Sequence, residues 1–367
     1  MTTASRRPRI SASKANFWQA LKRPFFVIAP MANVTDSVFR KLFAKYGRPD
    51  VMWTEFVSAD GLVSPGGRRL LKDLVFSEKE RPIVAQLFTG HPEAMKKAAA
   101  LVGRLGFDGL DINMGCPDRA VEKQGGGAAM IKSPRSAIAV LDAARAGVRS
   151  ARTGQRSLPV SIKTRLGYNS IDLSWIGLLL EQCLPALTIH LRTRKEMSLV
   201  PAHWEVMPKI VDMRDRIQAA LPVGQRTLII GNGDVGSLAQ ARDYCRRYGC
   251  DGVMIGRGIF GKPWFFARKS AYRSGLLPAA PEMKPAARLG ILLEHARSFE
   301  REFCPRGRNG TVMRSKRVKS FDVMKKHFKA YVSGWDGAKE LRMRLMACEN
   351  YAEVERIVAG ELATCDV

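Results

Sequence analysis

The first chemical candidate in this 367-residue chain is a cysteine. Cys116 stands in Asn113-Met-Gly-Cys-Pro117, directly after an apolar run, and Gly125-Gly-Gly127 follows it. A glycine-rich loop of this kind is able to close over a substrate. A thiol on such a loop can donate a proton where a basic carboxylate cannot. We therefore expect Cys116 to be a general acid rather than a packing residue.

Polar and reactive side chains recur at the ends of short apolar runs along the chain. Lys163 stands at one such end, where it would form a Schiff base, hold a flavin or pair with an acid. Gln86 and Asn232 carry amides that match the donor and acceptor edges of a flat heterocycle. His190 is a candidate ligand of a flavin or a phosphate. The full set is Pro30-Met31-Ala32, Glu55, Gln86, Asn113, Cys116, Lys163, Arg165, His190, Arg192, Arg194, Asn232, Gly233, Asp234, Gly256 and Arg257.

A candidate phosphate site lies in Gly231-Asn-Gly-Asp-Val-Gly236, which fits the glycine pattern of dinucleotide-binding folds. That pattern needs an acidic residue at the end of the next strand to bind a ribose, and Gly256-Arg257 stands there instead. Glycine amides beside an arginine suit a monophosphate, and the seventh and eighth loops of barrels commonly hold one. We favour a barrel phosphate site over a Rossmann fold.

The elements that carry these residues are continuous Val/Ile/Leu runs, which indicate strands buried on both faces, as in a parallel sheet. Helical patterns lie between them, including 36–47, 92–106, 134–148 and 237–249. An Asp-Gly turn before a buried strand occurs twice, at 105–115 and 248–258. Repeated βα units favour a closed (β/α)8 TIM barrel of the α/β class over residues 23–275. The predicted strands are 25–32, 51–58, 83–89, 109–115, 160–167, 186–193, 228–234 and 252–258.

Strand signals stop after Pro263, and residues 284–367 read as a small helical domain, with helices predicted at 287–299, 321–332 and 338–346. Arg301–Leu345 carries thirteen Lys or Arg against four acids, with aromatic residues interleaved. We interpret the rings as the core of the helices and the charge as a surface for RNA phosphates. Residues 1–22 are basic and free of acids, and we expect a disordered leader there.

Composition limits the partners. Lys and Arg total 60 against 34 Asp and Glu, a net charge of +26 that favours a nucleic-acid partner over a membrane surface. The seven cysteines are scattered without zinc spacing, so we expect a reducing compartment and no metal site. No apolar run approaches the roughly 20 residues of a membrane span. We expect a soluble cytoplasmic protein, and a monomer.

These residues together resemble the tRNA-dihydrouridine synthase family, from about Phe25 to Phe266 and again over Met324–Leu345. The ordered set is very specific. It consists of Ala29-Pro-Met-Ala32 with Thr35-Asp36, Thr54-Glu55-Phe56, Gln86-Leu87-Phe88, Asp111-Ile-Asn-Met-Gly-Cys-Pro117, Gly125-Gly-Gly-Ala128, Lys163-Thr-Arg-Leu-Gly167, His190, Arg192-Thr-Arg194, Asn232-Gly-Asp234 and Gly256-Arg-Gly258.

The resemblance implies an FMN-binding barrel followed by a tRNA-binding helical domain. NADPH would reduce FMN, which would pass hydride to C6 of a uracil ring while Cys116 protonates C5. By resemblance the flavin ligands are Pro30, Met31, Ala32, Gln86, Lys163, His190, Asn232, Gly233, Asp234, Gly256 and Arg257. The tRNA substrate would contact Asn113, Arg165, Arg192, Arg194, Arg314, Lys316, Arg317 and Lys319.

Three positions depart from the usual family pattern without removing a ligand: Asn33, Leu191 and Thr89-Gly-His91. Three other functions remain open. Another flavin barrel would act on a free pyrimidine or a small enone, but it would not explain the basic C-terminal helices. A Lys163 Schiff-base aldolase would need no flavin, and an RNA-binding protein on a barrel scaffold would need no catalysis.

Charge reversal of Arg314, Lys316, Arg317 and Lys319 is expected to weaken tRNA binding and to flatten its salt dependence, because each lost cation releases fewer counterions. Titration of tRNA across a salt series measures both effects. An unchanged dissociation constant and an unchanged salt slope would place the RNA elsewhere.

Overall fold

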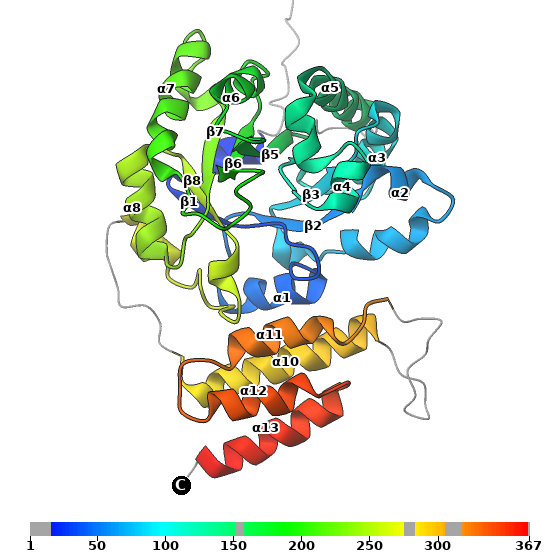
Figure 1. The fold of residues 1–367 in the computed structure, drawn as a ribbon, viewed down its shortest axis with the longest axis vertical. Coiled ribbons are helices and arrows are strands. Elements are labelled where there is room, and N and C mark those ends of the chain that lie inside the picture. The colour runs from blue at the N-terminus through cyan, green and yellow to red at the C-terminus, as the bar shows by residue number, and fades with distance from the viewer. Residues whose placement is uncertain (1–15, 151–157, 275–282, 305–317, 366–367) are drawn as a thin grey trace, which may run out of the picture.

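The protein is an eight-stranded parallel barrel that stands on a group of helices (Figure 1). The structure is a computed structural model that describes residues 16–150, 158–274, 283–304 and 318–365. The strands are β1 Phe25–Ile28, β2 Met52–Ser58, β3 Ile83–Phe88, β4 Gly109–Met114, β5 Val160–Gly167, β6 Ala186–Thr193, β7 Leu228–Asn232 and β8 Gly252–Ile255. Their order around the sheet is β1-β8-β7-β6-β5-β4-β3-β2.

The ring closes between β1 and β2. The Ile28 amide donates to the Val51 carbonyl at 3.3 Å, and the Asp50 amide donates to the Phe26 carbonyl at 2.9 Å. These bonds complete the TIM barrel that the apolar runs predict. β1 ends at Ile28, earlier than the predicted 25–32, and Pro30 beyond it has no amide to give to a ladder.

Helices alternate with the strands and surround the barrel. Residue types at helix ends explain several bounds: the Asp36 carboxylate caps α1 by accepting from the Phe39 amide at 3.0 Å, and Pro92 begins α3. The helices are α1 Ser37–Tyr46, α2 Ala59–Val63, α3 Pro92–Arg104, α4 Arg119–Lys123, α5 Pro134–Ser150, α6 Leu173–Leu180, α7 Met207–Ile217, α8 Leu238–Tyr248 and α9 Lys269–Ser274. Short 3-10 turns are η1 Phe17–Ala20, η2 Gly67–Leu74, η3 Glu78–Glu80, η4 Gly127–Lys132, η5 Trp204–Val206, η6 Val223–Gln225 and η7 Arg257–Ile259.

Part of the expected leader belongs to the folded barrel. Residues 1–15 lie outside the described part, but η1 is ordered and its Trp18 is 1% exposed. The indole lies 5.8 Å from the ring of Trp53 and 6.4 Å from that of Phe25, both in strands. The chain therefore contributes to the core from residue 16 onward, because a large apolar ring is buried there.

The C-terminal helices have their own hydrophobic core. They are α10 Pro285–Phe303, α11 Val323–Tyr331, α12 Ala338–Met346 and α13 Tyr351–Cys365. Phe321, Phe328 and Tyr331 are buried in that core, so the interpretation of these rings as packing residues is confirmed. Val38 of α1 and Trp264 belong to the same cluster, which attaches the helices to the barrel (Figure 1). None of the helices in the described ranges is long and apolar enough to cross a membrane.

A fully buried ion pair fixes α1 and the loop before it. The Arg40 guanidinium donates to Glu80 at 2.6 Å, to the Thr35 carbonyl at 2.7 Å and to the Val75 carbonyl at 2.5 Å. Both charged side chains are 0% exposed. Because each charge is desolvated, the pair holds only while both members and their hydrogen bonds are present.

Arg40→Met is expected to destabilise the fold by about 3–5 kcal/mol, because it leaves the Glu80 carboxylate buried without its cation. Thermal unfolding followed by circular dichroism measures the change. The control is Arg246→Met, which breaks the exposed Arg246–Asp243 pair of α8 and should hardly move the midpoint. Equal shifts in the two variants would contradict the assignment.

Candidate functional site

A hollow of about 540 Å³ opens at the carboxyl ends of the strands. This is the end of a parallel barrel at which loops carry chemistry. Residues of five strands or the loops after them meet in its wall. The lining residues are Ala29, Pro30, Met31, Lys163, His190, Arg192, Ser198, Asn232, Gly233, Asp234, Val235, Gly236, Met254, Gly256, Arg257 and Gly258. Most of the predicted cofactor residues are therefore in one cavity.

Two arginines converge on one side of the hollow through Asp234. Arg192 is ion-paired with one Asp234 oxygen, and Arg257 donates to the other at 3.1 Å. Burial of Asp234 opposes ionisation, yet the hydrogen bonds from Arg192 and from the Ala202 amide hold the pKa of this carboxyl below its usual value. The carboxylate orients the two cations, while their excess positive charge remains available to an anion.

Backbone at this side approaches very closely, as a phosphate cradle requires. Gly233 has a φ of 137°, and a Cβ there would lie 2.7 Å from the Ala202 Cβ. A Cβ on Gly258 would lie 2.2 Å from the Val235 carbonyl oxygen. These glycines therefore allow the loops after β7 and β8 to come together. The Asn232 side chain donates to the Met254 carbonyl at 2.8 Å, which ties β7 to β8 below the cradle.

Lys163 faces the hollow without a hydrogen-bond or ion-pair partner among the described residues. Burial lowers the pKa of its ammonium to about 8, and the Arg165 guanidinium acts in the same direction. Burial, with the Lys163 and Arg165 cations, also lowers the pKa of His190 well below its usual value. Near neutral pH the site therefore contains a charged, unpartnered ammonium beside a neutral imidazole.

Cys116 follows β4 on the loop at this end of the barrel and is half-buried. Burial raises the pKa of its thiol, while the Asp118 backbone amide and the Lys163 and Arg165 cations oppose the rise. Gly127 has a φ of 60°, and a Cβ there would lie 2.5 Å from the Cys116 carbonyl oxygen, so the glycine run packs against this loop. The thiol is held in its protonated form, as a proton donor must be.

A chain of buried polar groups orients the loop of Cys116. Asp111 accepts from the Gln86 amide at 2.6 Å, Gln86 accepts from Asn113 at 3.1 Å, and Asn113 accepts from the Cys116 amide at 2.9 Å. Gln86 is fully buried and is not a lining residue of the hollow, so the structure places this predicted flavin ligand behind the cavity wall. Ala32, also predicted there, is exposed and outside the lining.

Two of the predicted substrate arginines hold backbone and loops. Arg165 is buried and donates to the carbonyls of Gly115 at 2.8 Å, Thr193 at 2.9 Å and Met197 at 2.9 Å. Arg194 pairs with Glu122 of α4 at 2.5 Å. These bonds join the loop after β6 to the loop of Cys116, so both arginines shape the rim of the site.

The predicted RNA cations of the C-terminal region separate into two groups. Arg314, Lys316 and Arg317 lie outside the described residues. Lys319 is 9% exposed and forms a buried ion pair with Glu55 of β2, so its ammonium does not lie on the surface. The charge-reversal variant is therefore best restricted to the other three cations.

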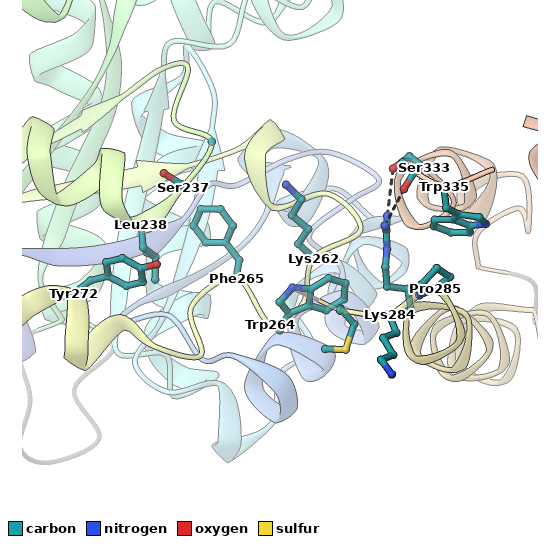
Figure 2. A pocket seen from close by; sticks show the side chains of 14 residues that line it. Ser237, Leu238, Lys262, Trp264, Phe265, Tyr272, Lys284, Pro285, Ser333 and Trp335 are labelled. Carbon is teal, nitrogen blue, oxygen red and sulfur yellow. Dashed lines mark hydrogen bonds between the residues drawn. The ribbon is translucent and has the colours of Figure 1, made fainter. Parts of the chain in front are cut away.

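A second, larger hollow of about 810 Å³ lies between the barrel and the C-terminal helices and shares Gly236 with the first (Figure 2). The Arg288 guanidinium lies 4.8 Å from the Trp335 ring and donates to the Ser333 carbonyl at 2.8 Å. The lining includes no carboxylate among the described residues. It comprises Gly236, Ser237, Leu238, Lys262, Trp264, Phe265, Tyr272, Met283, Lys284, Pro285, Arg288, Ser333, Gly334 and Trp335. Lys163, His190, Arg192 and Arg257 line the smaller hollow, so we place the site there. Cys116 is not one of its lining residues and lies on the loop after β4.

Sequence reasoning gave no role to three residues that shape the site. Asp111 begins the buried polar chain, Glu122 receives Arg194, and Ser198 lines the hollow. Burial raises the pKa of Asp111 to about 6, against the hydrogen bonds from Gln86 and Ser161. A carboxylate inside a strand that is buried on both faces was the available signal for Asp111. Glu122 and Ser198 lie in ordinary polar sequence and offered none.

Comparison with known proteins agrees with this geometry. The model of a family described as dihydrouridine synthase matches residues 27–364. The chain is 38% identical over 348 residues to a probable tRNA-dihydrouridine synthase of Staphylococcus epidermidis, covering 94% of this chain and 96% of that protein. It is also 38% identical over 346 residues to probable tRNA-dihydrouridine synthase 2 of Bacillus subtilis, covering 94% of this chain and 95% of that protein.

Alkylation of Cys116 by iodoacetamide is expected to accelerate only above the pH range of an ordinary thiol, because the thiolate reacts and burial raises its pKa. Mass spectrometry of the Cys116 peptide across a pH series, with free glutathione in the same tubes, measures the inflection. Lys163→Met should leave the inflection nearly where it is, because burial lowers the pKa of the Lys163 ammonium to about 8 and the side chain is largely neutral in that pH range. An inflection below the usual value of about 8.5 would contradict the assignment.

Proposed function

Because this chain belongs to the dihydrouridine synthase family, we propose that it is an FMN-dependent enzyme that reduces the C5=C6 bond of uridines in tRNA, with NADPH as reductant. The observation that carries the proposal is the hollow in which an unpartnered Lys163 faces a glycine–arginine cradle, with a protonated thiol on the neighbouring loop. Lys163 would bind the flavin ring, the glycine–arginine cradle would bind its phosphate, and the Cys116 thiol would donate the proton.

The residues present fit FMN. The two arginines and the glycine backbone after β7 and β8 would hold the phosphate, because close amides and cations suit a monophosphate. Pro30 and Met31 would pack on the ring, and Lys163 would donate to its polar edge. His190 is neutral and would serve as a hydrogen-bonding ligand. Gln86 would act through Asn113, because Gln86 is fully buried and does not line the hollow.

Cys116 would supply the proton that the reaction needs. When bound, FMN supplies the hydride that adds to C6, and the carbanionic C5 then takes the proton from the Cys116 sulfur, which leaves a thiolate. Because its pKa is raised, the Cys116 thiol would keep this proton until the uracil ring is bound. Lys163 is positioned to stabilise negative charge on a uracil carbonyl as it develops.

The RNA must present an unstacked base. A uridine paired within a helix cannot reach a hollow among strand ends, so the target base would be flipped into it. Several features favour RNA as the carrier of this uracil over a free pyrimidine. They are the net charge of +26 and the cations Lys262, Lys284 and Arg288 at the adjoining hollow.

Cys116→Ala is expected to keep FMN and tRNA binding but to lower dihydrouridine formation by about 10²–10⁴-fold, the usual contribution of a general acid. FMN uptake is measured by flavin absorbance. Dihydrouridine is measured by mass spectrometry of nucleosides, after reaction with NADPH and tRNA from cells that lack this gene.

The matched control is Cys183→Ala, which removes an exposed thiol far along the chain and should leave turnover unchanged. Full turnover by Cys116→Ala would refute its role as proton donor. A colourless protein that takes up no FMN would instead favour Lys163 as a Schiff-base residue and would overturn the proposed function.

A further inference from the structure

The buried Lys319–Glu55 ion pair crosses the junction between the C-terminal helices and the barrel. Lys319 follows α10 and precedes α11, whereas Glu55 lies in the middle of β2. The two side chains are 7% and 6% exposed, and Asp73 lies 3.5 Å from the same ammonium. A buried charge is stable only while its partner of opposite charge is present, so this ion pair holds the segment before α11 against β2.

The second carboxylate oxygen of Glu55 accepts a hydrogen bond from the loop after β1, which borders the proposed flavin hollow. One carboxylate oxygen receives the Lys319 ammonium, and the other accepts the backbone amide of Asn33. Asn33 has a φ of 54°, a left-handed conformation that needs support in a residue other than glycine. Met31, two residues earlier, lines the hollow. The ion pair and the loop conformation are therefore linked through one carboxylate.

The backbone around Lys319 is anchored on both sides of the junction. The Val318 amide donates to the Phe303 carbonyl of α10 at 2.8 Å, and Lys72 of the barrel donates to the Val318 carbonyl at 2.7 Å. Lys319 also directly follows the segment of Arg314, Lys316 and Arg317, the predicted tRNA contacts.

We propose that Lys319 is a positioning residue: through Glu55 it holds the loop after β1 in the conformation that receives the flavin, and so couples the C-terminal helices to the cofactor. The proposal rests on the flavin site proposed above. Loss of the cation leaves Glu55 beside the buried carboxyl of Asp36 and the half-buried carboxyl of Asp73. Glu55 would then take up a proton or withdraw from Asn33, and the loop would lose its left-handed turn. Burial already raises the pKa of Asp36 to about 6, while Lys319 opposes that rise.

Lys319→Met is expected to weaken FMN binding by about tenfold or more, the effect of losing one charge-assisted hydrogen bond, and to alter the flavin absorption spectrum. Lys319→Arg should restore both, because a guanidinium also reaches a carboxylate. Glu55→Asp keeps the charge balance but shortens the side chain, so it should weaken FMN binding to a similar degree. This second variant tests the proposal even if Lys319→Met folds poorly. FMN affinity is measured by quenching of flavin fluorescence on the full chain.

The matched control is Lys45→Met, which removes a cation from the same junction. Lys45 of α1 pairs with Glu294 of α10 at 2.8 Å and does not touch Glu55. Its FMN affinity and flavin spectrum should equal those of the unmodified protein. FMN binding within about twofold of the unmodified protein in both Lys319→Met and Glu55→Asp would overturn the positioning role, whatever their thermal stability. Failure of the unmodified protein to bind FMN would overturn the proposed function instead.

Discussion

Closure of the parallel sheet is the constraint on which the rest of the structure depends. Eight strands that run in one direction around a ring must all end at one rim, and the bonds between β1 and β2 complete that ring. Residues that are far apart in the chain, such as Met31, Lys163 and Arg257, thereby meet in one hollow. Apolar side chains fill the amino end of the ring, whereas polar side chains nearer the rim are either paired with one another or face the cavity.

Buried polar groups then decide what each rim residue can do. Asp111, Gln86 and Asn113 are joined by hydrogen bonds, and Asn113 in turn accepts from the Cys116 amide and so orients the Cys116 loop. Arg165 likewise donates its guanidinium hydrogen bonds to backbone carbonyls. Lys163 differs because the described structure gives it no partner, and an ammonium desolvated in this way gains most from an incoming acceptor. The contrast separates groups that build the site from a group that binds in it.

The sequence predicts the barrel well, because buried strands and capped helices are local patterns. β5 and β6 have their predicted bounds, and nine of the eleven predicted cofactor residues line one hollow. It could not show that Gln86 lies behind the wall or that Lys319 is buried, since both depend on partners set by the tertiary fold. Lys319 meets Glu55 across 264 positions of the chain. In the sequence, a lysine within a basic stretch has the same pattern whether its side chain contacts RNA or forms a buried ion pair between two domains.

The amino end of the barrel has a different consequence. Trp18 covers Phe25 and Trp53 at the start of their strands, opposite the rim that holds the hollow. Trp18 therefore fills the amino end of the apolar barrel core. Removal of η1 would expose two aromatic rings at the base of the strands to water.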